Sequence, residues 1–233
     1  MTQKMKTFVS SFVIMLIAAS LNAQDCRLYF PDKVGAIREM KFYNDKDKLT
    51  SISRQEILEK SVSGKDVKIK VRSTAFDVDD KEVYSGDLEM LCEGGVFKFD
   101  MRSMIDPNTM NTYKEMGMEI TTDNIVYPSS INAGESLPDG NLKMVIKSGQ
   151  ATLMTIAITV SNRKVAARES ITTEAGTFDC YKLTYDSVVK MGFITVSSSA
   201  IEWIADGVGT VKSESYNKKN KLTGYSVLTK LTR

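Results

Sequence analysis

Hydrophobic and polar residues alternate along most of the chain beyond residue 24. In 67–72, valine and isoleucine alternate with lysine and arginine, and 153–160 shows the same period without a charged residue. Because successive side chains of a strand point to opposite faces, the first pattern predicts a strand with one solvated face and the second a central strand. The same reasoning predicts further strands at 36–43, 49–58, 83–92, 95–100, 118–126, 141–148, 163–173, 177–186, 192–204, 208–216 and 222–231.

Turn signals separate these strands, and no regular series of helices alternates with them. The clearest are Glu93-Gly94-Gly95, Asp139-Gly140 and Asp206-Gly207, where glycine can adopt a positive φ. Many strands without helical crossovers indicate antiparallel pairing. We therefore expect a mainly β fold, built as one curved antiparallel sheet in the manner of a half-barrel.

One short helix is predicted near 107–117. Asp106 is suited to the N-cap and Pro107 to the first helical position. Met110, Tyr113 and Met116 then recur at helical spacing, and Gly117 can end the helix in a left-handed conformation.

The segment 101–118 is rich in methionine, which is flexible and polarizable enough to fit varied apolar partners. The alternative, which the spacing favours, is a short helix that packs its methionine face on the sheet. The candidate ligand-binding residues are Met101, Met104, Met110, Tyr113 and Met116.

The first 24 residues have the pattern of a secretory signal. Lys4 and Lys6 precede an apolar stretch, Phe8 to Leu21, which is shorter than a comfortable membrane span, and Ala23 offers a cleavage site. We expect residues 25–233 to form a single antiparallel β domain, exported to the periplasm or the cell surface of a bacterium. No transmembrane segment is expected after cleavage.

The three cysteines of the mature chain are Cys26, Cys92 and Cys180. In an oxidising compartment an odd number indicates one disulfide with a spare thiol, or three free thiols, and the sequence leaves the pair open. Cys26 lies close behind the signal, where a lipoprotein would be acylated. Asp25 before it is unlike the small residue of a lipobox, which favours a soluble protein.

Composition narrows the possible chemistry. The chain contains no histidine, which excludes Ser-His-Asp and Cys-His catalysis and most zinc sites. Removal of the signal with its two lysines leaves a neutral chain, which has no electrostatic reason to bind nucleic acid. Asp77, Asp79 and Asp80 could ligate calcium, but they lack the EF-hand pattern and are typical of an acidic turn. We expect no catalytic residue, metal or cofactor.

Two local patterns bear on the fold. Residues 43–50 and 216–223 match at six of eight positions, and both are predicted to be hairpin turns, related either by duplication or by convergence on a favourable polar turn. Glu202 and Trp203 are adjacent within a predicted strand, so they should point to opposite faces. Trp203 is more typical of a core anchor than of a sugar-stacking surface.

Several motifs spread over nearly the whole mature chain resemble the TapB family of exported bacterial proteins. They are Tyr29-Phe30-Pro31, Tyr127-Pro128, Leu137-Pro138-Asp139-Gly140, 162–165, 169–182 and 203–212. A more distant likeness to LolA-like proteins implies a curved antiparallel sheet that holds lipoprotein acyl chains. The resemblance implies no catalytic residue. This sequence predicts only one helix, whereas LolA itself covers its sheet with several.

These observations favour an exported, non-enzymatic binding protein that holds a lipid or another apolar ligand in the envelope, near the methionine-rich segment. One alternative is a protein-interaction component of an envelope assembly that uses an exposed strand edge. A pocket filled by the protein's own side chains would favour that alternative. Another alternative is a glycan-active enzyme with two carboxylates.

Overall fold

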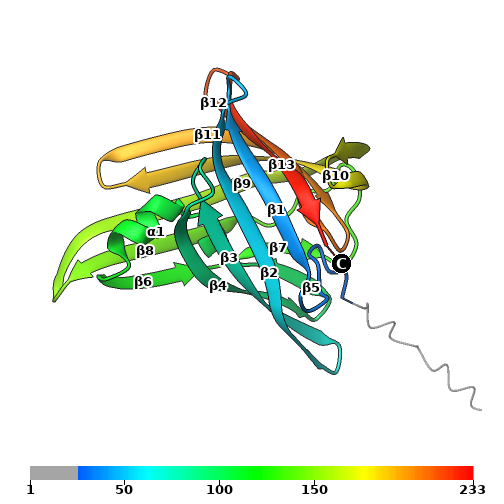
Figure 1. Ribbon diagram of the computed structural model, residues 1–233, viewed down its shortest axis with the longest axis horizontal. Helices are drawn as coiled ribbons and strands as arrows, with labels where there is room; N and C mark the ends of the chain where they lie inside the picture. Colours follow the sequence, from blue (N-terminus) through cyan, green and yellow to red (C-terminus); the bar gives the residue numbers. More distant parts are fainter. Residues whose placement is uncertain (1–25, 233) are drawn as a thin grey trace, which may run out of the picture.

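The computed structural model describes residues 26–232, which form one antiparallel sheet of thirteen strands (Figure 1). The predicted signal, 1–24, lies outside the described residues. The sheet order is β6-β8-β9-β10-β11-β12-β13-β1-β2-β3-β4-β5-β7. The strands are β1 (Ile37–Asn44), β2 (Leu49–Ser63), β3 (Asp66–Phe76), β4 (Glu82–Glu93), β5 (Val96–Phe99), β6 (Gly117–Thr122), β7 (Ile125–Pro128), β8 (Gly140–Ser148), β9 (Ala151–Thr173), β10 (Gly176–Met191), β11 (Ile194–Ala205), β12 (Gly209–Asn217) and β13 (Leu222–Leu231).

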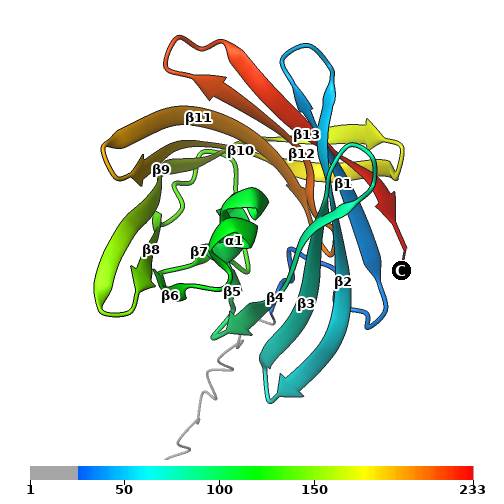
Figure 2. The same ribbon diagram turned by 60° about the vertical axis from the view of Figure 1, so that its left-hand side comes forward.

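The sheet is strongly curved, and it encloses the helical segment on its concave side (Figure 2). That segment consists of the 3-10 turn η1 (Met101–Met104) and the helix α1 (Pro107–Tyr113). α1 packs against β4, and η1 packs against β8. The prediction of a mainly β half-barrel with one short α-helix is confirmed.

The start of the helix is as predicted, but its end is not. The side chain of Asp106 accepts a hydrogen bond from the Thr109 backbone N–H, with Pro107 in the first turn. The helix ends at Tyr113, however, and Gly117 begins β6. Gly117 pairs with Lys147 of β8. The residue that helical spacing predicted as a C-cap is therefore part of the sheet.

A bulge in β9 decides which side chains face the concave side. The predicted strands 153–160 and 163–173 are one continuous strand, with Asn162 at φ 54°. The register with β10 shifts there, so Asn162 and Arg163 lie opposite the single residue Tyr185. The extra residue reverses the alternation, which turns Arg163 and Val165 to the buried side.

The core has two parts. The larger cluster fills the concave side and includes Tyr29, Phe97 and Met144. A smaller cluster surrounds Trp203 and the buried free thiol of Cys180. The expectation that Trp203 is a core anchor is confirmed.

Both repeated turns are hairpins, as predicted, and both contain the same pattern of hydrogen bonds. Asn44 accepts backbone hydrogen bonds from Lys46 and Lys48, and Asn217 accepts the equivalent bonds from Lys219 and Lys221. The first turn joins β1 to β2 and the second joins β12 to β13. This common hydrogen-bond pattern is compatible with an origin by duplication and with an origin by convergence. The acidic run near residue 79 is also a turn, in which Asp77 accepts two backbone hydrogen bonds.

The disulfide joins Cys26 to Cys92 of β4, with their Cα atoms 5.9 Å apart. It ties the segment that carries the buried Tyr29 and Phe30 to the sheet. A sulfur in a disulfide is not available for the thioether of a lipoprotein.

Candidate functional site

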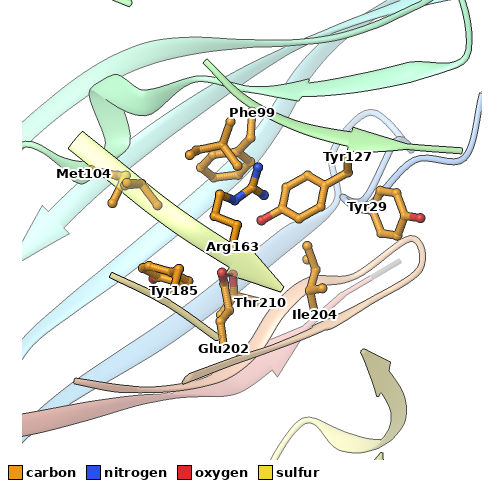
Figure 3. Close-up of a pocket in the computed structure, with 12 residues that line it drawn as sticks. Tyr29, Phe99, Met104, Tyr127, Arg163, Tyr185, Glu202, Ile204 and Thr210 are labelled. Atoms are coloured by element: carbon orange, nitrogen blue, oxygen red, sulfur yellow. Dashed lines mark hydrogen bonds between the residues drawn. The ribbon is translucent and has the colours of Figure 1, made fainter. Parts of the chain in front are cut away.

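A cavity of about 90 Å³ lies between the concave side of the sheet and the segment around η1 (Figure 3). β9, β10, β11 and β12 line one side, and β5, η1, β7 and the segment before β1 line the other. Its wall is mostly apolar, with a few polar groups among aromatic rings. The lining residues are Tyr29, Phe99, Met104, Ile125, Tyr127, Val160, Arg163, Tyr185, Glu202, Ile204, Gly209 and Thr210.

Arg163 is the cation of this cavity, and the β9 bulge places it there. Its Nη1 donates to the carbonyl oxygens of Val126, at 3.0 Å, and Pro138, at 2.6 Å. Its Cζ lies 4.9 Å from the centroid of the Tyr127 ring. The residue is only 4 % exposed, yet its Nη2 has no hydrogen-bond partner.

Glu202 is the only carboxylate among the residues that line the cavity. Its Oε1 accepts a hydrogen bond from the hydroxyl of Thr210. Burial raises the pKa of Glu202, although that hydrogen bond and the positive charges of Arg163 and Arg38 oppose the rise.

Arg38 supplies a second buried positive charge, from β1. Its guanidinium donates to Gln55 Oε1 and to the carbonyl of Thr210, both at 2.5 Å, and its Nε has no partner. Burial lowers the pKa of Arg38 to about 10. The side chain therefore still carries its charge at neutral pH, close behind the cavity wall that Gly209 and Thr210 form.

Three tyrosines complete the polar part of the wall. Burial raises the pKa of Tyr29 to about 12 and raises the pKa values of Tyr127 and Tyr185 further above the usual range for tyrosine. All three phenols are therefore neutral at physiological pH, and their hydroxyls act as hydrogen-bonding groups and not as bases.

The structure disperses the five residues predicted to bind a ligand. Met104 lines the cavity, whereas Met101 and Met110 are buried in the core. Tyr113 packs partly against the core, and Met116 is exposed on the turn after α1. The structure thus brings only Met104 to the cavity.

Sequence reasoning missed Arg163 as a functional residue and examined Glu202 only as a neighbour of Trp203. A signal was available for both, since each is the first charged residue after a long uncharged run, 148–162 and 191–201 respectively. A lone charge that follows an apolar strand is a candidate for a buried functional group.

A second feature is an apolar end of the sheet, where the β8–β9 and β10–β11 hairpins project from the same side (Figure 1). The backbone N–H of Gly192 donates to the carbonyl of Thr155, which ties one hairpin to the other strand. Five of the nine large hydrophobic side chains exposed in the described part of the chain lie at this end. They are Met116, Leu153, Phe193, Ile194 and Val196.

Two further observations concern the described residues, 26–232. None of their helices has the length and apolar character needed to cross a membrane. Their His, Cys, Asp and Glu side chains form no group of three that could hold a metal ion.

The fold and the cavity define a class of β protein with one open, curved sheet around a short helical segment. The chain belongs to the DUF3108-like family, whose model matches residues 33–228. None of the curated proteins matches the chain.

Two solved structures are similar over nearly the whole chain. A candidate exported protein with a YmcC-like fold from Bacteroides fragilis NCTC 9343 has 26 % identity and a TM-score of 0.77, covering 89 % of this chain and 100 % of that one. A candidate lipoprotein from Parabacteroides distasonis ATCC 8503 has 27 % identity and a TM-score of 0.77, covering 90 % of this chain and 100 % of that one. Their descriptions indicate an envelope location in bacteria.

Proposed function

We propose that the protein is a non-enzymatic binding protein of the bacterial envelope, and that its apolar end binds an extended apolar segment of another envelope protein. The observation that carries the proposal is the open edge of β11 beside Phe193. Pairing of β11 with β12 ends at Ser198 and Asn217, so Ile194–Ser197 has a neighbour only in β10. Phe193, at the tip, has a relative exposure of 109 %.

The backbone of this edge is suited to the addition of a strand. Met191 pairs with Ile194 across the two-residue turn Gly192–Phe193, and Gly192 has φ 57°. Because the pair that closes such a turn is hydrogen-bonded, the N–H and C=O groups of Thr195 and Ser197 point to the open edge. An extended peptide would satisfy them, and its side chains would meet Ile194 and Val196 on one face.

The same edge argues against a lipid bilayer as the occupant. Unpaired backbone groups are costly in hydrocarbon because no water is present to bond them. The uncharged runs 148–162 and 191–201 also contain no lysine or arginine for anionic headgroups. Lys147 and Lys190 directly precede the two runs, and Lys147 is paired with Glu119. A protein strand satisfies both the apolar side chains and the backbone.

The hypothesis of a lipid carrier has less support than the proposed protein-binding role. The cavity volume of about 90 Å³ is well below the roughly 300–1,000 Å³ of drug-sized ligand pockets. Met101 and Met110, which were expected to contact a lipid, are core residues. A two-carboxylate glycosidase also lacks support at the cavity, where Glu202 is the one acid.

The test is site-specific photo-crosslinking in the native envelope. A photoreactive phenylalanine analogue at position 193 or 196 should give one discrete crosslinked product whose partner peptide, mapped by mass spectrometry, is apolar and extended. The matched control is the same analogue at Val78, an exposed apolar residue at a distant turn. Thr195→Pro removes one edge N–H and should abolish the product while leaving thermal stability nearly unchanged.

Two outcomes would contradict the proposal. One is a crosslink to lipid only, which would assign the apolar end to a membrane surface. The other is a product that forms equally from position 78 or that survives Thr195→Pro, because neither result needs the β11 edge.

A further inference from the structure

A second hollow lies on the face of the sheet opposite the cavity. It is a groove of about 420 Å³ over β9, β10, β11 and β12, which are consecutive in the sheet (Figure 2). Glu202 borders the cavity, and side chains alternate between the faces of a strand, so Ser199 and Ile201 lie on the other face, in the groove. Its volume falls within the roughly 300–1,000 Å³ of small-molecule sites.

The strand register builds the groove from a row of polar side chains. Asp186 of β10 pairs with Ser199 of β11, which pairs in turn with Tyr216 of β12. Residues directly opposite in antiparallel strands share a face, so the short Ser199 lies between two longer side chains and leaves a hollow. Asn162, at the β9 bulge, extends the row beyond Asp186. Asn220, in the turn after β12, borders the other end.

The polar side chains of the groove are open to a solute. Asn162 and Asn220 are exposed, and Thr184, Asp186 and Ser199 are partly exposed. The Nδ2 of Asn162 donates to Asp186 Oδ2 at 2.8 Å, which leaves the second carboxylate oxygen and the amide oxygen for a ligand. The hydroxyls of Thr184 and Ser199 can each donate and accept. The groove therefore presents donors and acceptors side by side.

Tyr216 is held in place by a chain of contacts along β12. Its hydroxyl donates to Glu214, and Glu214 pairs with Lys212 at 2.6 Å. The bond to Glu214 raises the pKa of Tyr216 to about 12, so the phenol keeps its proton and this bond at neutral pH. Because the hydroxyl is already bonded, the ring is what Tyr216 offers to a ligand. A side chain that is already fixed loses little entropy on binding.

The charges around the groove favour a neutral ligand. Among the residues that line it, Asp186 is the one with a charge, so an anionic ligand would be repelled. A cationic ligand would meet Lys218 and Lys219, which are exposed directly before Asn220 in the same turn.

We propose that this groove binds a neutral saccharide, with sugar hydroxyls bonded to Asp186 and Asn162 and an apolar face of the sugar ring against Tyr216. A hydroxyl both donates and accepts, which suits a carboxylate beside an amide. The C–H face of a sugar suits an aromatic ring. The site goes beyond the protein-binding role of the β11 edge and does not rest on it, because none of the exposed apolar residues at that end lines the groove.

The experiment is saturation-transfer NMR on the mature protein. The methyl glycosides of glucose, galactose and mannose are the neutral probes, and the uronate and the 2-amino sugar of each are its acidic and cationic counterparts. At least one neutral glycoside should show saturable transfer, strongest at its ring C–H protons. Its uronate and its amino sugar should both bind more weakly.

The variants assign the binding to the groove. Asp186→Asn should weaken binding of that glycoside by at least tenfold, because it removes the charge-assisted bond. Asp179→Asn is the matched control on the same strand, since Asp179 is exposed, pairs with Arg168 and does not line the groove. Tyr216→Ala should also weaken binding, and Tyr216→Phe, which restores the ring, should recover it.

The wild-type comparison keeps the proposal falsifiable even if a variant does not fold. Absence of saturable transfer to all three neutral glycosides would overturn it, and so would equal or tighter binding of the uronate or the amino sugar. Binding that survives both Asp186→Asn and Tyr216→Ala would place the sugar outside the groove, which also overturns the assignment.

Discussion

Glu202 and Trp203 are consecutive residues of β11 that lie in different environments. Glu202 borders the cavity and accepts a hydrogen bond from Thr210, whereas the Trp203 indole donates to Glu169 at 2.8 Å, within the smaller core cluster. The two glutamates therefore differ in their surroundings, since desolvation raises the pKa of Glu202 and hydrogen bonds lower the pKa of Glu169. Their substitution should affect stability in opposite directions.

Glu202→Gln should stabilise the protein at pH 8. Because the folded-state pKa of Glu202 is raised above the unfolded value of about 4.3, the wild type loses stability as pH rises through the folded pKa. Glutamine removes that loss of stability, and this pH-dependent difference should vanish at pH ~3, well below the unfolded pKa, where the carboxyl is protonated in both states. Thermal unfolding at the two pH values measures this.

Glu169→Gln is the matched control for that experiment. Hydrogen bonds from Trp203 and Lys182 lower the pKa of Glu169, so its contribution is present above the unfolded pKa and is lost in acid. This variant should be less stable than the wild type at pH 8. Equal melting curves for Glu202→Gln and the wild type at pH 8 would contradict a raised pKa of Glu202 in the folded protein.

Gly140→Ala should destabilise the protein by about 1–3 kcal/mol through overpacking. A Cβ at position 140 would lie 2.6 Å from Ile125 Cδ1 and 3.0 Å from Met101 Sδ. Gly117→Ala is the control, because its Cβ would meet Lys147 Cβ at 3.6 Å, an ordinary contact. Chemical denaturation of both variants gives the difference, and a Gly140→Ala protein as stable as Gly117→Ala would disprove the close packing.

Gly207→Val should cost about 1–3 kcal/mol for a different reason, backbone strain. Gly207 has φ 64° in the turn between β11 and β12, and a Cβ there would have no neighbour within 4 Å. The cost therefore comes from the positive φ and not from a clash. Gly207→Asn should recover much of the loss in denaturant unfolding, since asparagine tolerates this region. No difference between valine and asparagine would argue against the strained turn.

The oxidised mature protein should contain one free thiol under denaturing conditions, that of Cys180. Loss of the disulfide through the double substitution of Cys26 and Cys92 by serine should cost about 2–5 kcal/mol, because the bond closes a long loop in the unfolded chain. Cys180→Ala should lower the thiol count to zero and leave the disulfide intact. Three free thiols in the wild type would show that no bridge forms.

Much of the fold could be predicted from local patterns. The period of two in 67–72 and 153–160 indicates strands, and Asp106-Pro107 indicates the start of a helix, because both signals depend only on neighbouring residues. The ends were less predictable. Gly117 had suitable properties for a helix C-cap, but its pairing with Lys147, 30 positions along the chain, placed it in β6.

The candidate site could not be predicted in the same way. Arg163 faces the cavity because a bulge at Asn162 changes the register with Tyr185, and a one-residue change of register exchanges the two faces of a strand. The methionine-rich segment drew attention for its composition, yet composition does not distinguish a core face from a binding face. Burial of Met101 and Met110 depends on the curvature of the whole sheet.

The sequence by itself determined the class of fold, the hairpin turns and the absence of histidine chemistry, because each follows from residue type and local spacing. The tertiary structure decided which cysteines pair, which one of the five candidate residues reaches the cavity, and that Arg163 and Glu202 line the same cavity. Those outcomes depend on contacts between residues distant in the chain, which curvature, register and the order of thirteen strands bring together.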